Sequence, residues 1–225
     1  MTAISSALEL LNSYIASNDE AILTQLKDAL LECDNTDSSL HDSFFKQCKK
    51  EFGEKLWNCL DSETQELIVG SFADFEHQKE NKLNVSSSFS SIASSFEAEL
   101  KSKIFNDFNT VIKERIDNYN EKFDHQYVDA LTSGNFVPAA MMVSKLKYMK
   151  SPKGISKDLR SFLEDYWDIY SLSDDNKIDE AFELISVRND NAHGSTNKQY
   201  DQWQEVKEMT VRVLRWFIFS CDYFN

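Results

Sequence analysis

The stretch FSSIASSFEAELKSKIFNDFNTVI, residues 89–112, decides the fold class. Its apolar residues recur at steps of three and four over roughly six or seven helical turns. They are Phe89, Ile92, Ala93, Phe96, Leu100, Ile104, Phe108, Val111 and Ile112. This spacing places them on one face of a helix, so the pattern predicts a long amphipathic helix with a buried side.

Shorter patterns of the same kind predict further helices on both sides of this stretch. They lie at about residues 7–31, 40–60, 62–79, 127–131, 138–149, 162–170, 178–185 and 203–221. The polar segment Cys33–Ser39 is expected to end the first of them, and Ser62 with Gln65 resembles a capping box. No alternating run argues for a strand, and 5 Gly and 2 Pro are few for a fold built on tight turns. The sequence therefore predicts an all-α protein.

Composition limits the classes of function. Hydrophobic residues make up 41% of the chain, which excludes a disordered protein, and the net charge of −14 argues against general coating of nucleic acid duplexes. The four cysteines and four histidines lack the spacing of a zinc site, so no metal or cofactor is expected and the thiols should be reduced. No apolar run approaches the ~20 residues that cross a bilayer, so no membrane partner and a cytoplasmic location are expected.

One polar segment carries the residue types needed for phosphate chemistry. Arg188-Asn189-Asp190-Asn191-Ala192-His193 follows an apolar helical pattern and precedes Gly194. A histidine can transfer a proton near neutral pH, and a guanidinium can hold a phosphate through two parallel hydrogen bonds. Together they suffice in principle for attack of an RNA 2′-hydroxyl on its own phosphodiester without metal. The two side chains converge more easily if the helix ends inside this segment.

The chain resembles HEPN domains. Their signature is Arg-Asn, three residues and His, here with Ala192 before the histidine and Gly194 after it. Residues 89–105 are similar to the first long helix of these domains, and residues 131–149 resemble the segment that precedes the motif helix. The resemblance covers roughly residues 61–225, which gives a HEPN-like domain at 61–225 and an N-terminal helical extension at 1–60.

This resemblance implies an up-and-down helical bundle that commonly dimerises and brings two motifs into one cleft. Many members are ribonucleases of toxin–antitoxin, CRISPR-linked or phage-defence systems. Carried over to this sequence, Arg188 would hold the phosphate, His193 would be the general acid and base, and Asn189 would orient them. The implied partners are RNA, a second copy of the chain and an antitoxin or regulatory protein.

A basic stretch supplies candidate RNA-binding residues. Between residues 139 and 160 the basic residues are Lys145, Lys147, Lys150, Lys153, Lys157 and Arg160, and Asp158 is the one acid. Such a local excess of positive charge can attract phosphates, and Tyr148 could stack on a base. Of these residues, Lys145, Lys147, Lys150 and Lys153 are the predicted RNA contacts.

The same residues also have purely structural interpretations. Arg188 and His193 could cap the end of a helix, and the lysines could form an ordinary solvated surface. Glu97 and Glu99 are expected to be surface or helix-pairing groups. The function would then be that of a non-catalytic HEPN module binding a partner protein or a nucleotide, or of a purely structural bundle.

Overall fold

The structure is a computed structural model that describes residues 9–15, 20–119, 124–133, 137–192 and 200–222, without the side chains of residues 29–38, 118 and 191–192. Every regular element in these residues is a helix, and the isolated bridge between Trp167 and Cys221 is their one extended pairing. The prediction of an all-α protein is confirmed. None of the described helices is both long and apolar enough to cross a bilayer.

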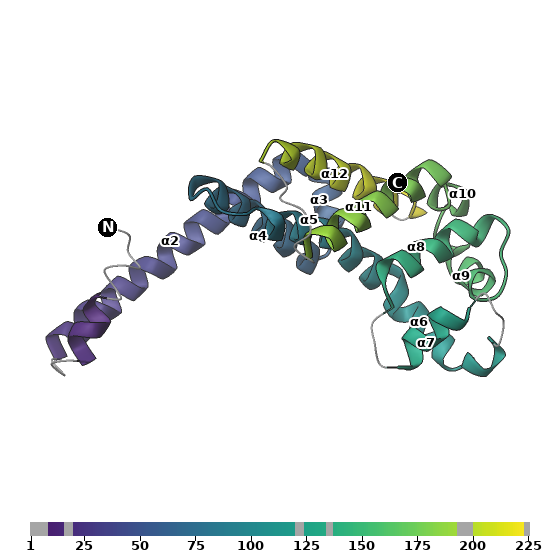
Figure 1. Cartoon of the computed structure of the whole chain (residues 1–225), viewed down its shortest axis with the longest axis horizontal. Helices are drawn as coiled ribbons and strands as arrows, with labels where there is room; N and C mark the ends of the chain where they lie inside the picture. The colour runs from purple at the N-terminus through teal and green to yellow at the C-terminus, as the bar shows by residue number, and fades with distance from the viewer. Residues whose placement is uncertain (1–8, 16–19, 120–123, 134–136, 193–199, 223–225) are drawn as a thin grey trace. The chain divides into compact units, whose positions relative to one another are not determined.

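Residues 9–15 are helical, and twelve labelled α-helical and π-helical segments follow with three 3₁₀ turns among the described residues (Figure 1). They are α2 (Glu20–Phe52), α3 (Glu54–Cys59), α4 (Ser62–Glu80), α5 (Ser86–Leu100), the π turn η1 (Lys101–Phe105), α6 (Asn106–Lys113), η2 (Ile116–Asn118), α7 (His125–Thr132), α8 (Ala139–Lys147), η3 (Tyr148–Lys150), α9 (Ile155–Leu163), α10 (Ile169–Leu172), α11 (Asp175–Ala192), η4 (Tyr200–Gln202) and α12 (Trp203–Phe219).

The chain divides into two compact units, Met1–Gln47 and Cys48–Asn225. In the second unit Leu56, Trp57 and Leu60 are buried, so residues 48–60 contribute to its core. The domain boundary expected between residues 60 and 61 follows the family resemblance, and the extent of a HEPN domain stays a prediction.

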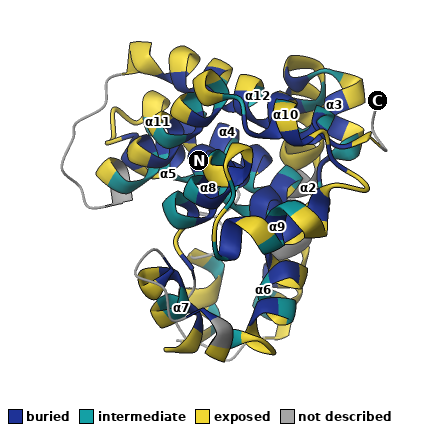
Figure 2. Cartoon of the chain, turned by 90° about the vertical axis from the view of Figure 1, so that its right-hand side faces the viewer, coloured by how far each residue is buried: buried dark blue, intermediate teal, exposed yellow. Residues whose placement is uncertain are grey.

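The predicted long helix lies at the centre of the second unit. α5, η1 and α6 are continuous, and α5 packs against α4, α11 and α12 (Figure 1). The predicted apolar residues are buried except Val111, which is half-buried. Figure 2 shows that buried residues lie on the inner sides of the helices and exposed residues on their outer sides.

An aromatic cluster joins α4, α5 and α12. The Trp203 ring stacks on Phe75 with 4.4 Å between ring centroids, and Phe72 and Phe89 meet it edge-on. Burial of rings of this size gives much of the stability of such an interface. Beyond η1, α6 packs against α7 and α9, and α8 packs against α9 and α11.

Three local predictions were wrong. α2 continues through Cys33–Ser39, because residues 20–52 contain no Gly or Pro and the weak helix propensity of Asp, Asn and Ser does not stop a helix by itself. Residues 162–170 do not form one helix, because α9 ends at Leu163 and α10 begins at Ile169. Ser62 lies inside α4 rather than at its N-cap, which is Asp61, and the Gln65 amide donates to the Trp57 carbonyl at 2.8 Å.

Candidate functional site

Helix α11 places Arg188 beside α5. Its inner face is buried against α5 through residues such as Leu184, Ile185 and Val187. Arg188 follows directly at the edge of this face, and 40% of its side chain is exposed. The guanidinium is therefore anchored on a packed helix and still accessible to a ligand.

Glu97 on α5 holds the Arg188 side chain. Arg188 Nη2 lies 3.4 Å from Glu97 Oε2, and Arg188 Nη1 donates to Asn189 Oδ1 at 3.0 Å. Glu97 also pairs with Lys101 one turn further along the helix, at 2.6 Å. Two cations thus share one carboxylate, and this Arg188–Glu97–Lys101 cluster carries a net positive charge.

The contacts of Arg188 differ from those of a helix cap. Its partners in the described part of the chain are the side chains of Glu97 and Asn189, not main-chain carbonyls. α11 extends to Ala192, so Arg188, Asn189 and Asp190 all lie on the helix. His193, the predicted general acid and base, lies outside the described residues.

Lys147 and Lys150 are paired with acids at the other end of α11. Lys147 Nζ lies 3.1 Å from Asp179 Oδ1, and Lys150 Nζ lies 3.0 Å from Asp175 Oδ2. These acids precede Arg188 by nine and thirteen residues, which is roughly 14 Å and 20 Å along a helix. The structure therefore does not gather these two lysines with Arg188.

Lys145 is not a surface residue. Its ammonium group lies 2.5 Å from Asp124 Oδ1 and over the Tyr127 ring, and its side chain is 11% exposed. Lys153, by contrast, is exposed, and no partner for it is seen in the described residues. Of the four predicted RNA contacts, Lys153 is the one whose charge is not matched by a described carboxylate.

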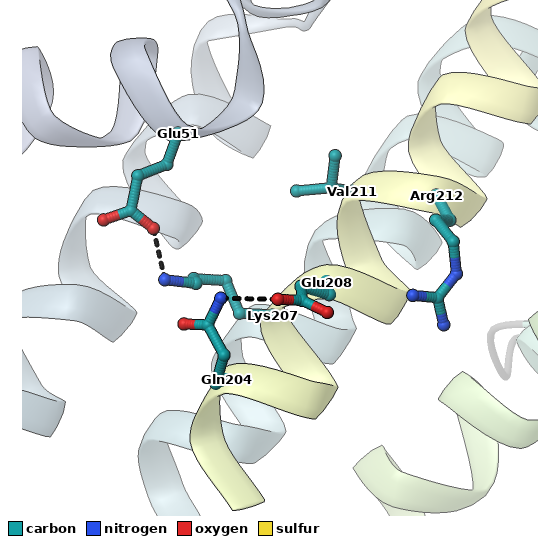
Figure 3. A pocket seen from close by; sticks show the side chains of 6 residues that line it. All are labelled: Glu51, Gln204, Lys207, Glu208, Val211 and Arg212. Carbon is teal, nitrogen blue, oxygen red and sulfur yellow. Dashed lines mark hydrogen bonds and ion pairs between the residues drawn. The ribbon is translucent and has the colours of Figure 1, made fainter.

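An open groove of about 580 Å³ runs along α12 (Figure 3). It is lined by Glu51, Gln204, Lys207, Glu208, Val211 and Arg212. Lys207 pairs with Glu51, the Gln204 amide donates to Glu208 at 2.6 Å, and Arg212 Nε donates to Glu180 at 2.5 Å. Lys207 and Arg212 are each paired with a glutamate, and Glu208 receives only an amide hydrogen bond, so this groove offers no surplus positive charge to an anionic ligand.

Glu99 on α5 was expected to be a surface or helix-pairing group, and the structure agrees with the second of these. It is fully buried, and its Oε1 accepts the N–H of Asp61, the N-cap residue of α4, at 2.6 Å. Lys103 lies 3.9 Å from its Oε2 and also pairs with Asp61. Burial raises the pKa of Glu99, whereas hydrogen bonds from Lys103 and Ser102 outweigh burial and lower the pKa of Asp61.

Of the two ion pairs of Glu97, the sequence could have indicated the pair with Lys101 but not the pair with Arg188. Glu97 and Lys101 stand four residues apart, the spacing of an ion pair on a helix. The pairing of Glu97 with Arg188 depends on how α5 and α11 are rotated against each other, which no local pattern encodes.

Comparisons with protein-family models, with curated proteins and with solved structures found no match. The described residues also hold no group of three or more His, Cys, Asp or Glu side chains arranged for a metal ion.

Proposed function

We propose that this protein is a metal-independent endoribonuclease of the HEPN type, with Arg188, His193 and Asn189 as its catalytic residues. The observation that carries the proposal is the position of Arg188. It projects from a packed helix, is partly exposed, and is held by a carboxylate that it shares with Lys101.

The charge of this cluster suits a phosphodiester. One negative phosphodiester would balance the surplus positive charge of Arg188, Glu97 and Lys101, and the guanidinium can donate two parallel hydrogen bonds to its oxygens. In the proposed reaction, His193 removes the proton of the RNA 2′-hydroxyl, the 2′-oxygen attacks phosphorus, and the bond to the 5′-oxygen breaks. The leaving 5′-oxygen takes up a proton, and the other fragment ends in a 2′,3′-cyclic phosphate.

The proposal includes a homodimer in which two motifs form one composite cleft, with an antitoxin or regulatory protein as a further partner. A closed two-fold dimer brings the same surface of both copies together, so two copies of Arg188 can face one substrate. Sedimentation at equilibrium would give the mass of a dimer, and a monomer at working concentrations would remove the composite site from the proposal.

The test is cleavage of a mixed RNA pool in EDTA. We expect the wild-type protein to produce fragments with cyclic phosphate ends, and the Arg188→Ala/His193→Ala variant to be at least about 100-fold slower, because a general acid–base group contributes that much. Arg212→Ala is the matched control, since Arg212 is also half-exposed and paired with a glutamate on a neighbouring helix. Its rate should be unchanged.

Two outcomes would contradict the proposal. Equal cleavage by the folded double variant would place the active site elsewhere or reveal a contaminant. A loss of activity in Arg212→Ala as large as in the double variant would indicate general damage rather than a role for the motif.

A second candidate, a non-catalytic HEPN module that binds a partner protein, is favoured by one specific observation. Lys145, Lys147 and Lys150 are each neutralised by a carboxylate of the same chain, in a protein of net charge −14. This leaves less basic surface for RNA than the sequence predicts. A defined protein partner bound through the Arg188 face, without RNA turnover, would support this alternative.

A further inference from the structure

A second concave site lies where α8, η3 and the start of α9 meet. It is a cavity of about 520 Å³, which is within the roughly 300–1,000 Å³ typical of small-molecule pockets. Hydroxyl and ammonium groups are present in its lining, on Ser144, Lys145, Tyr148, Ser151, Lys153 and Ser156. Arg188 does not line it.

Asp124 fixes one wall of this cavity. It pairs with the buried Lys145 at 2.5 Å and accepts the Ile155 N–H at 2.9 Å. Gly154 has a φ of 51°, and a Cβ at this position would lie only 1.8 Å from Asp124 Oδ2. The carboxylate can therefore approach the start of α9 only because residue 154 is a glycine.

Part of the unmatched positive charge of the basic stretch lies at the cavity, because Lys153 is in its lining. Lys147 and Lys150 are paired with acids of α11, whereas Lys153 and Lys157 are exposed and have no partner in the described part of the chain. Arg160 donates to the Met149 carbonyl at 3.2 Å, which leaves its charge unbalanced. The one acid of the stretch, Asp158, accepts the Tyr119 hydroxyl at 2.5 Å.

The lining contains what is needed to recognise a phosphate attached to a flat ring. Lys153 supplies a mobile ammonium group, and Ser151 and Ser156 supply hydroxyl donors for phosphate oxygens. Tyr148 lines the same cavity and is 59% exposed, so its ring is accessible to a base. Because Lys145 and Asp124 balance each other, an anionic ligand would find a net positive lining.

We propose that this cavity is a nucleotide-binding site, in which Lys153 with the serine hydroxyls holds the phosphate and Tyr148 stacks on the base. The ligand is a nucleoside monophosphate, either free or as the phosphorylated terminal nucleotide of an RNA chain. The site is separate from the Arg188 cluster and does not depend on the ribonuclease proposal.

The test is isothermal titration of the full chain with AMP, adenosine, ribose 5-phosphate and inorganic phosphate. We expect AMP to bind best, because it alone offers both the phosphate and the base. Lys153→Ala and Tyr148→Ala should each weaken AMP binding about tenfold, the scale of one charge-assisted hydrogen bond or one stacked base. Lys147→Ala is the matched control, because Lys147 is a nearby, partly exposed lysine paired with Asp179 and outside the cavity lining, and it should leave the affinity unchanged.

Short RNAs with and without a terminal phosphate identify the source of the ligand. If the phosphorylated RNA binds more tightly than AMP and loses affinity in Lys153→Ala, the terminal nucleotide of RNA is the ligand. If AMP binds and the RNA does not, the ligand is a free nucleotide. AMP has no internucleotide bond, so its binding is independent of any cleavage activity.

Three results would overturn the proposal. The first is no binding of AMP or of phosphorylated RNA at millimolar concentration. The second is AMP binding that Lys153→Ala and Tyr148→Ala leave unchanged. The third is inorganic phosphate binding as tightly as AMP, which would mean that the base is not recognised.

Discussion

Glu97 links two side chains that come from distant parts of the sequence. Lys101 lies one turn away on the same helix, and Arg188 reaches Glu97 from α11. A single carboxylate carries one negative charge against two positive ones, and the partly exposed Arg188 guanidinium can pair with an incoming anion. The sequence motif predicts Arg188 but not Glu97, because nothing in residues 188–193 identifies the partner on the neighbouring helix.

Glu99 and Asp61 give the protein two opposite dependences on pH. Burial raises the pKa of Glu99 above its usual 4.5, so the folded protein keeps this proton at a pH where the unfolded chain has lost it. The contribution of Glu99 to the free energy of unfolding therefore falls as pH rises from about 4.5 through the folded pKa.

In the Glu99→Gln variant, the pH-dependent contribution of residue 99 to the free energy of unfolding should disappear. The side chain no longer titrates, and its amide oxygen can still accept the Asp61 N–H. We expect the free energy of unfolding of the variant, relative to wild type, to increase as pH rises from 4 to 8 in urea titrations. A difference that stays constant with pH would contradict the burial of a titrating Glu99.

The Asp61→Asn variant should show a pH dependence of stability that is different in origin, because it removes a carboxylate whose ionised form stabilises the folded protein. Because the pKa of Asp61 is lowered in the folded protein, its ionised form adds stability above its usual 3.8 and loses it in acid. This variant should be less stable than wild type near pH 7, and the difference should shrink as pH falls.

The central helix shows how spacing in the sequence encodes a local change in helix geometry. Phe96, Leu100, Ile104, Phe108 and Ile112 follow one another at intervals of four, and each such step overshoots a full α-helical turn by about 40°. Over four steps the drift would be about 160°, which would turn Ile112 away from the side of Phe96. Both are nevertheless fully buried, because the π turn Lys101–Phe105 holds one extra residue and removes about 100° of the drift.

Deletion of Ser102 should therefore be tolerated. It would shorten the π turn to an ordinary α-helical turn and leave the apolar residues on one face. We expect cooperative unfolding with a loss of about 1 kcal/mol, mainly from the lost hydrogen bond to Asp61. The matched control is deletion of Ser94 in the regular part of α5, which would rotate one side of the helix by about 100° and should prevent folding.

Thermal melts followed by circular dichroism would separate these two deletions. If both prevent folding, the π turn is not a spare residue but a required part of the packing. If both fold equally well, the apolar face of α5 does not control the structure as described.

At the level of elements, the spacing of apolar residues predicted the buried helices well, whereas polar composition was a poor guide to where helices end. The patterns at residues 62–79 and 203–221 agree with α4 and α12, because their apolar faces are packed in the core. Cys33–Ser39 suggested a turn only through composition, and α2 continues through it. Tyr166 and Tyr170 suggested a helical face, but both are exposed, and this segment pairs instead with the end of α12 through Trp167 and Cys221.

For the whole molecule, the two compact units predict where the chain can be shortened. Residues 48–225 retain Phe52, Leu56, Trp57 and Leu60, all of which are buried. A fragment of residues 61–225, cut at the expected family boundary, loses all four. Loss of even one large buried side chain costs about 2–5 kcal/mol, comparable to the stability of a typical domain.

We therefore expect residues 48–225 to unfold cooperatively and residues 61–225 to be unfolded or aggregated, as measured by urea titration of circular dichroism. Stable folding of the shorter fragment would show that residues 48–60 are an appendage. Failure of the longer fragment to fold would show that residues 1–47 are needed by the second unit.

The placement of the indole rings has an optical consequence. All four tryptophans of the chain, Trp57, Trp167, Trp203 and Trp216, lie in the second unit and are buried. Trp203, stacked on Phe75, is also held in an asymmetric aromatic surrounding. Intrinsic tryptophan emission therefore reports on the second unit without any label, because residues 1–47 contain no tryptophan.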